Sequence, residues 1–374
     1  MEQLSIISTP TLSNIINDND TYKFTVGNIN VSLANAVRRT ILSDIPIVGI
    51  YTETHKENQC KIEINTSRMH NELIKHRLSC IPIHITDLDI LPNNYILEVD
   101  VKNDTDTTVI VTTEDFKIKN KENGNYLTRE ETKKIFPPNT KTNMYIDFVR
   151  LRGKISDTIP GEHIKLTAEF SVHRANESSV YNVVSKCTYS NTIDMIKANE
   201  VWDQTEVKLR SENLTDEDIK FQKKNFFLLD AERHFIQDSF DFAIRSVGVY
   251  ENVDIVKMAC SILEKRLAEI IHSIDSNTIP INISETTMDN CYDVILENED
   301  YTLGKVIEFV LYESHYVREK TLTFCGFKIY HPHNTSGVLR LAFSMNSDKG
   351  MVAQYLRTAC NQAMDFFVKF NKMF

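Results

Sequence analysis

Apolar and polar positions between residues 22 and 51 predict a strand, a helix and a second strand. The strands are expected at Tyr22 to Ile29 and at Ile47 to Tyr51. Ser32 is the expected N-cap of the helix, because its hydroxyl can accept a hydrogen bond from a free N–H of the first turn. At about 100° per residue, one arc of the helix carries its apolar residues, namely Leu33, Ala34, Ala36, Val37 and Ile41. The other arc carries Asn35, Arg38 and Arg39, so we expect a buried face and a polar face with two adjacent arginines.

The same pattern returns between residues 292 and 311. A strand-like run again leads into a polar turn, a hydroxyl residue (Thr302) as the expected N-cap, and a helix. The apolar face of this helix carries Leu303, Val306, Ile307, Val310 and Leu311. The offset between matching residues is constant, since 303 − 33 and 307 − 37 are both 270. Glu308 and Phe309 replace the arginine pair, so the sequence predicts two copies of one module, with the basic pair in the first copy.

The segment from 52 to 178 alternates apolar and polar residues, for example at Tyr95 to Val101 and Ile164 to Val172, and it predicts a mostly β insertion. Within it, the run from Asn65 to Ile85 predicts a capped helix followed by an extended segment. Residues 197–224 are polar and mixed in charge, and we interpret them as solvated helices or a surface insertion. Residues 1–20 are polar and are expected to form a tail or a first short strand.

Both halves are predicted to end with a strand and a long helix that bears an apolar stripe. In the first half the helix is expected at Val253 to Ile274, and in the second half at Met351 to Phe370. Residues 276–290, which lie between the halves, are polar and predict a linker. A linker of about 15 residues spans at most roughly 50 Å.

Three of these stretches carry a family resemblance. VSLANAVRRTILSDIP (31–46) resembles the signature helix of the RNA polymerase alpha-like subunits: bacterial alpha, archaeal D and the third-largest eukaryotic subunit. NEDYTLGKVIEFVL (298–311), followed by GFKIYHPH (326–333), resembles their small partner, archaeal L and its eukaryotic counterpart. His76-Arg77-Leu78 resembles the family motif in which a short helix leads into an Ile-Pro strand.

The resemblance implies an α+β fold in which two pseudo-symmetric dimerisation modules, usually separate chains, are fused. The implied alpha-like module comprises residues 1–51 and 179–275, with a β-rich insertion domain at 52–178. The linker at 276–290 then leads to an L-like module at 291–374. Many family members carry a cysteine-ligated metal site in the insertion. No cysteine lies between Cys80 and Cys187 here, so we expect that site to be absent and expect no cofactor.

The implied function is that of a non-catalytic assembly platform of a DNA-directed RNA polymerase. The intramolecular heterodimer would dock the second-largest subunit. Small zinc-binding subunits would bind the insertion and the first half, and the largest subunit would join through the assembled complex. The partner-binding residues that the resemblance implies are Asn35, Arg38, Arg39, Asn65, Thr66, His76 and Arg77. The implied interface between the two modules comprises Leu33, Val37, Ile41, Leu303, Ile307, Val310, Leu263, Leu267, Ala359 and Phe366.

From the residues alone, two alternatives stay open at these positions. The arginine pair can lie on a merely solvated helix face. The apolar faces of the two module helices can pack within their own halves instead of across a shared interface. Both arrangements bury the same residues, so burial does not separate them.

Composition limits the remaining function classes. The net charge of −10 argues against broad, sequence-independent binding of nucleic acid, which needs dense Lys and Arg contacts to phosphates. The seven cysteines are scattered and indicate reduced thiols rather than a disulfide framework. We see no apolar run long enough for a membrane span and expect an intracellular protein. The fusion and the abundance of Asn and Ile suggest a large DNA virus, with the protein in the viral factory and the virion, or in the nucleus.

An enzyme is the rival hypothesis. A metal-dependent site around His70, His76, Cys80 and His84 is conceivable, because these side-chain types bind transition metals. His331, His333 and Cys325 lack a fourth ligand, and we favour a turn there. No P-loop, dinucleotide-binding or nucleophile-elbow pattern occurs in the chain. A homodimeric regulator built from the repeated module is a third possibility.

Overall fold

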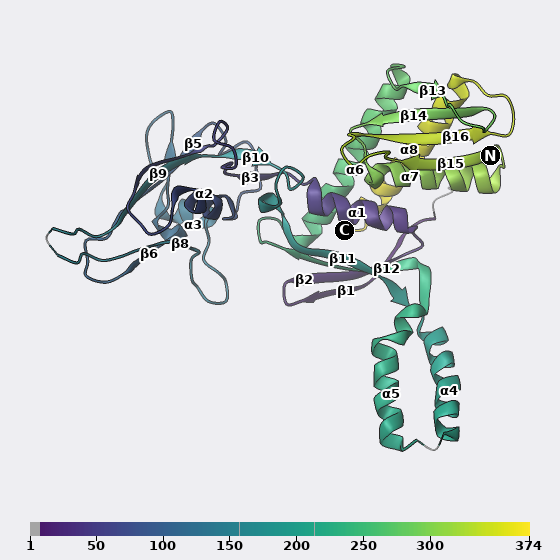
Figure 1. Ribbon diagram of the computed structural model, residues 1–374, viewed down its shortest axis with the longest axis horizontal. Coiled ribbons are helices and arrows are strands. Elements are labelled where there is room, and N and C mark those ends of the chain that lie inside the picture. The colour runs from purple at the N-terminus through teal and green to yellow at the C-terminus, as the bar shows by residue number, and fades with distance from the viewer. Residues whose placement is uncertain (1–7, 157, 213) are drawn as a thin grey trace. The chain divides into compact units, whose positions relative to one another are not determined.

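The computed structural model describes residues 8–156, 158–212 and 214–374, which fold as two compact units (Figure 1). The platform unit runs to residue 41, resumes at 186–245 and continues from 252 to 374. The insertion unit comprises residues 42–185 and 246–251. The predicted strand at 47–51 belongs to the insertion unit, because β3 (Ile47–Gly49) pairs with β10 (Ser171–His173). The predicted mixture of helices and strands is confirmed.

The first sheet of the platform unit has four strands in the order β1-β2-β12-β11. They are β1 (Thr11–Asp18), β2 (Thr21–Gly27), β11 (Val184–Ile193) and β12 (Phe235–Ser246). Strand β2 pairs antiparallel with both β1 and β12, and in this register Phe24 lies opposite Phe242. The two rings stack with their centroids 5.1 Å apart, and both are buried. The predicted strand in the N-terminal tail is β1, while residues 1–7 lie outside the described part of the chain.

Helix α1 (Val31–Ser43) follows β2 as predicted, but its N-cap differs from the expectation. The Asn30 side chain accepts a hydrogen bond from Ser32 N at 2.8 Å, so Asn30 rather than Ser32 is the cap. In the second half, α7 (Tyr301–Leu311) is capped by Asp300, whose carboxylate accepts from Thr302 N at 2.8 Å. The prediction of Ser32 and Thr302 as caps was therefore wrong. The helices begin earlier, and an Asx side chain reaches the free N–H groups first.

The second sheet of the platform unit has the order β13-β14-β16-β15. Its strands are β13 (Ile281–Ile283), β14 (Cys291–Glu297), β15 (Leu322–Lys328) and β16 (Ser336–Phe343). Helix α7 continues into a π-helical turn, η4 (Tyr312–Arg318). Part of the predicted linker is a strand, since Ile281–Ile283 form β13 and Ile281 pairs with Val294 of β14. The connection between the halves is therefore residues 276–280.

Two long helices of the platform unit, α6 (Asn252–Asp275) and α8 (Lys349–Asn371), pack against each other. Their apolar stripes are buried, as the periodicity predicted. Each of the ten predicted interface residues is at most 3% exposed: Leu33, Val37, Ile41, Leu263, Leu267, Leu303, Ile307, Val310, Ala359 and Phe366. Helices α6 and α8 come from different halves of the chain.

The insertion unit is mostly β. A four-stranded sheet has the order β4-β9-β5-β7, and β6 pairs with β8. These strands are β4 (Cys60–Asn65), β5 (Tyr95–Lys102), β6 (Val109–Thr112), β7 (Lys117–Asn120), β8 (Asp147–Leu151) and β9 (His163–Glu169). Short helices complete the unit, namely α2 (Asn71–Ser79), η1 (Thr113–Asp115), α3 (Arg129–Ile135) and η2 (Ser179–Tyr181).

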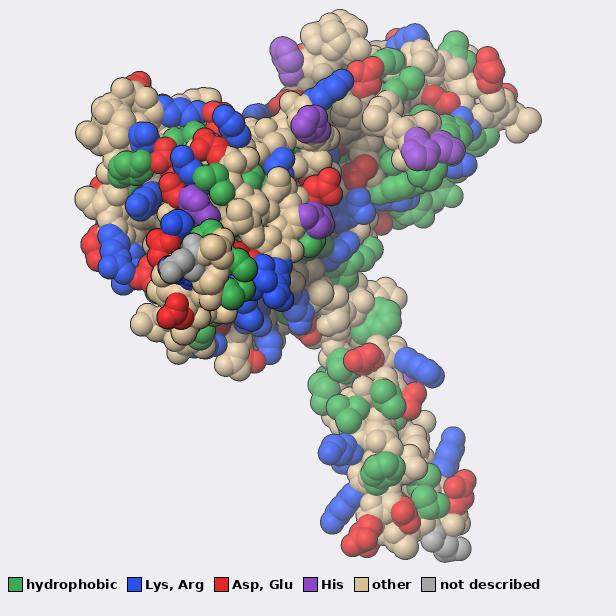
Figure 2. Space-filling view, turned by 60° about the vertical axis from the view of Figure 1, so that its left-hand side comes forward, with side chains coloured by type: hydrophobic (Ala, Val, Ile, Leu, Met, Phe, Trp, Pro, Cys, Tyr) green, Lys and Arg blue, Asp and Glu red, His purple; other side chains and the backbone are tan. Residues whose placement is uncertain are grey.

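A helical hairpin connects β11 to β12 in the platform unit (Figure 1). It consists of α4 (Met195–Ser211) and α5 (Asp216–Leu228), followed by the short turn η3 (Asp230–Arg233). The sequence indicated solvated helices or a surface insertion in this segment, and the structure forms two helices there. Figure 2 shows hydrophobic side chains interspersed with charged ones along the hairpin surface. The hairpin also has a core of its own around the buried Trp202.

Two glycines of the second half make room for the ring of Phe327, and their substitution should destabilise the fold. A Cβ at Gly337 in β16 would lie 2.0 Å from the ring, and one at Gly304 in α7 would lie 2.4 Å from it. We expect Gly337→Ala to lower the free energy of unfolding by about 1–3 kcal/mol, because β16 is paired on both sides and the ring must move. The measurement is the urea midpoint at unchanged m-value.

Gly350→Ala is the matched control, because the nearest atom to a Cβ there is 3.4 Å away, on the Asp348 side chain. Shortening the ring by Phe327→Leu should reduce the cost of Gly337→Ala. Equal urea midpoints for Gly337→Ala and Gly350→Ala would contradict the steric account.

Candidate partner-docking site

The polar face of α1 carries the predicted docking residues Asn35, Arg38 and Arg39, and the two arginines have different environments. Asn35 Oδ1 accepts hydrogen bonds from Arg38 Nε at 3.1 Å and from Arg38 Nη2 at 2.8 Å. This local bond fixes the guanidinium on the helix that bears it. Arg38 also lies near Cys187 of β11: burial raises the pKa of that thiol to about 12, and the positive charge of Arg38 opposes the rise.

Arg39 contacts the second half of the chain. Its Nη2 lies 2.5 Å from Asp300 Oδ2, and its Nε donates to Thr302 Oγ1 at 2.8 Å. Burial disfavours the charged form of Asp300, but hydrogen bonds with Thr302 and the charge of Arg39 outweigh burial and hold its pKa below the usual range. The sequence did not single out Asp300. The repeat could have drawn attention to Asp300 as a helix cap, because it occupies the position of Asn30 at the offset of 270 residues.

A second ion pair joins the same two halves. Arg266 of α6 donates to Glu299 from Nη2 at 2.6 Å and from Nε at 3.3 Å. The Glu299 residue is only 9% exposed, so this pair is largely shielded from water. Sequence reasoning singled out neither residue: Glu299 lies within the motif at 298–311 and Arg266 within the predicted helix, but nothing near either residue indicates the other.

The predicted docking residues of the insertion unit take part in its internal hydrogen bonding. Arg77 donates to the main-chain carbonyls of Phe148 at 2.9 Å and of Asp147 at 2.7 Å, which ties α2 to β8. The Asn65 amide donates to Met69 O at 2.8 Å, and the Thr66 hydroxyl accepts from His163 N at 2.8 Å. These contacts brace the turn between β4 and α2. The role of Asn65, Thr66, His76 and Arg77 in binding a partner stays a prediction.

The residues of the enzyme hypothesis serve separate structural roles. His70 caps α2 by accepting from Leu73 N at 3.4 Å, and burial lowers the pKa of His84. His76 Nε2 lies 3.9 Å from the exposed Cys80 thiol. Within the described ranges, no three His, Cys, Asp or Glu side chains come close enough to share a metal ion. The geometry therefore does not favour the metal-dependent alternative.

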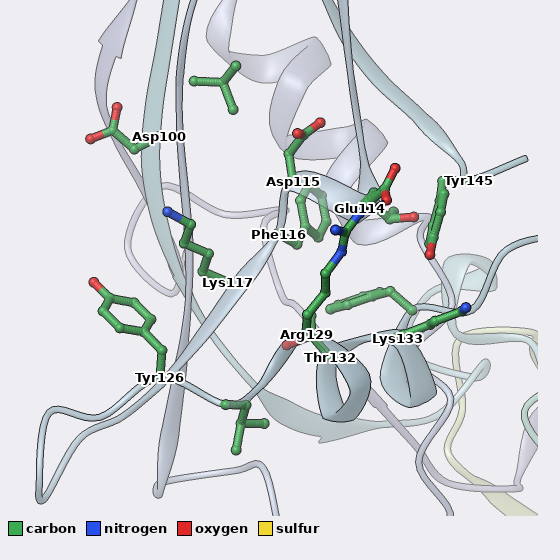
Figure 3. Close-up of a pocket in the computed structure, with 14 residues that line it drawn as sticks. Asp100, Glu114, Asp115, Phe116, Lys117, Tyr126, Arg129, Thr132, Lys133 and Tyr145 are labelled. Carbon is green, nitrogen blue, oxygen red and sulfur yellow. Dashed lines mark hydrogen bonds and ion pairs between the residues drawn. The ribbon is translucent and has the colours of Figure 1, made fainter.

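A cavity of about 780 Å³ opens in the insertion unit between β5, β7, η1 and α3 (Figure 3). Its acidic side chains are already engaged: Asp100 contacts His163 at 2.7 Å, Arg129 reaches Glu114, and Asp115 accepts from Thr112 N at 2.9 Å. Figure 3 shows Lys117 and Tyr126 on one side of Arg129, and Lys133 and Tyr145 on the other. No base stands beside a nucleophile among these lining residues, so we assign the cavity no reaction.

Among the described residues, no helix combines the length and the apolar composition that crossing a lipid bilayer requires.

Comparison with known proteins decides the family. The sequence model of the RNA polymerase Rpb3/Rpb11 dimerisation domain matches residues 23–267, which is more than half of the 374-residue chain. The chain belongs to this family. The match spans α1 and most of α6, the elements that place Arg38, Arg39 and Arg266. The predicted alpha-like character of the first half is therefore confirmed.

Three relatives illustrate the similarity to Rpb3/Rpb11 family members. Subunit 3 of DNA-directed RNA polymerases II, IV and V from Arabidopsis thaliana is 39% identical over 64 residues, 17% of this chain and 18% of the relative. Subunit RPB3 of RNA polymerase II from Schizosaccharomyces pombe is 35% identical over 69 residues, 18% of this chain and 21% of the relative. The Rpo3 subunit from Methanosphaera stadtmanae is 24% identical over 289 residues, 69% of this chain and 96% of the relative. The first relatives are thus matched over about a fifth of their length.

Proposed function

We propose that this chain is a non-catalytic assembly platform of a multisubunit DNA-directed RNA polymerase. In this proposal, an alpha-like half and a small-partner half form the heterodimer within one polypeptide. The observation that carries the proposal is the packing of α6 on α8, because it joins the family-matched half to the half that follows it.

The pseudo-symmetry of the two halves is part of the proposal, and several features support it. Each half has a four-stranded sheet, a short helix after a strand, and a long closing helix. The short helices α1 and α7 are capped by Asn30 and Asp300, which differ in number by the same 270 residues as the apolar positions. A cap, a buried small residue and an apolar face at one constant offset are typical of a duplicated module.

The mechanism is geometric. Residues 276–280 connect α6 to β13, and Thr278 N and Ile279 N donate to Ser273 O at 2.9 and 3.2 Å. A connection this short keeps the two halves at high effective concentration, so their pairing does not depend on two chains meeting. The paired halves then offer a preformed surface to larger subunits, which lowers the ordering cost of assembly.

The proposed partners follow from the family. The second-largest polymerase subunit would dock on the polar face of α1 and on the insertion around Asn65, Thr66, His76 and Arg77. Small zinc-binding subunits would bind the insertion and the first half, and the largest subunit would join later. We further propose a large DNA virus as the source, with the protein acting in viral factories and packaged in virions. The net charge of −10 supports little direct contact with DNA.

Affinity purification of the tagged full chain from its natural source tests this function. We expect two very large polymerase subunits to co-purify, identified by mass spectrometry. Charge reversal on the polar face of α1, Arg38→Glu, should remove them. Glu122→Lys on an exposed turn of the insertion unit is the control and should retain them. Recovery of the wild-type chain without polymerase subunits would refute the proposal.

A further inference from the structure

Two arginines of the first half meet two consecutive acids of the second half. Arg39 of α1 contacts Asp300, and Arg266 of α6 contacts Glu299. The acids come directly before α7, where a negative charge is favourable next to the free N–H groups of the helix. Asp300 serves both purposes, because one carboxylate oxygen caps α7 and the other accepts from Arg39.

These charges are not repeated at the matching positions of the other half. At the offset of 270 residues, Glu299 and Asp300 correspond to Ile29 and Asn30, which carry no charge, and Arg39 corresponds to Phe309. Two first halves that paired with each other would therefore place arginines opposite an uncharged pair. Only a first half facing a second half forms the two ion pairs.

Arg38 differs from its neighbour in its partner, which is the uncharged side chain of Asn35. No carboxylate of the described residues lies within 4 Å of its guanidinium, and Asn35 occupies only two of its N–H donors. Because the Asn35 side chain is neutral, it leaves the charge of Arg38 uncompensated, and its two hydrogen bonds restrict the orientation of the guanidinium. A guanidinium fixed in this way favours a carboxylate, which it can bind through two parallel hydrogen bonds.

We propose that Glu299 and Asp300 form a pairing latch that holds Arg39 and Arg266, and that Arg38 alone binds a carboxylate of the docking subunit. The inference rests on the proposed function and divides the adjacent arginines into one that pairs the halves and one that contacts a partner. The family-implied docking role of Arg39 is replaced by a role inside the chain.

The test compares three full-chain variants by two readouts, the recovery of large polymerase subunits and the unfolding equilibrium of the purified chain. Arg38→Ala should lower recovery at least tenfold and leave unfolding unchanged. Glu299→Gln should shift the folded-to-unfolded ratio more than tenfold toward unfolded, because it removes the negative charge that faces the shielded guanidinium of Arg266. Asp300→Asn should shift the ratio by up to about fivefold, since its pair is partly exposed. Asparagine still caps the helix, as Asn30 does in the first half.

Both latch variants should retain recovery within twofold at a temperature where they are folded. Arg39→Ala combined with Asp300→Asn should destabilise less than the sum of the single effects, because both remove one interaction. Additive effects, or a loss of recovery in Asp300→Asn as large as in Arg38→Ala, would overturn the inference. Failure of the proposed function is a different result: the wild-type chain then recovers no polymerase subunit, while the coupling of Arg39 to Asp300 still decides the latch.

Discussion

Replacing Leu267 by alanine is expected to lower the free energy of unfolding by about 2–5 kcal/mol. Leu267 is fully buried on α6, the helix that packs against α8 of the other half. Truncation removes apolar atoms from a close-packed interior, and the cavity that remains adds to the loss of transfer free energy. Urea unfolding monitored by circular dichroism measures the change, provided that the m-value stays constant.

Lys265→Ala provides the control on the same helix, since Lys265 is exposed and its loss should change stability by less than about 0.5 kcal/mol. The shape of the transition carries further information. A core shared by both halves should unfold in one transition that Leu267→Ala shifts as a whole. Two transitions, of which the variant shifts only one, would restore the alternative in which each half has its own core.

The sequence predicted the platform helices well because burial of one helix face requires a period of 3.6 residues. The stripes of α1, α6, α7 and α8 are visible in the printed residues and are buried in the structure. The N-caps of α1 and α7 were misplaced by two residues, at Ser32 and Thr302 instead of Asn30 and Asp300. All four residue types cap helices, so the choice depends on where the backbone turns helical, which periodicity does not define.

The short strand β13 was not predicted, because its sequence shows no clear periodic pattern. Strand β13 has three residues, of which only Ile281 is buried, so it shows no alternation that separates it from a polar linker. Its place at the sheet edge comes from pairing with β14 and not from its own sequence. Local patterns predict such strands poorly because the stabilising contacts lie elsewhere in the chain.

At the candidate site, the sequence identified residues but not the contacts that they make. The arginine pair of α1 was found from its adjacency and from the family motif, but the different partners of Arg38 and Arg39 were not. Arg39 meets Asp300 from 261 positions away, and nothing local to either residue indicates the other. Likewise, Arg77 stands in a recognisable motif, while its bonds to the carbonyls of Asp147 and Phe148 follow from the fold. Motifs thus identify residues, whereas the fold assigns their contacts.

Replacing Trp202 by alanine is expected to unfold the α4–α5 hairpin. Trp202 is 1% exposed in a small core whose other buried members are Ala198, Ile219, Phe226 and Ala231. Its ring lies 5.6 Å from that of Phe226, and its indole N–H donates to Glu206 at 3.0 Å. Replacing a buried tryptophan by alanine lowers the free energy of unfolding by about 3–5 kcal/mol. A core of only five buried side chains has too few other contacts to compensate for this loss.

Limited proteolysis and amide hydrogen exchange measure the effect separately for the hairpin and for the sheets. The arginine and lysine sites of α4 and α5 should become cleavable and their amides should exchange faster, while the amides of β2 and β12 stay protected. Val207→Ala is the matched control on α4, because Val207 is 70% exposed and should change neither readout. If protection falls equally in the hairpin and the first sheet, the hairpin is not a separate cooperative unit, and its core also stabilises the strands β11 and β12 that it connects.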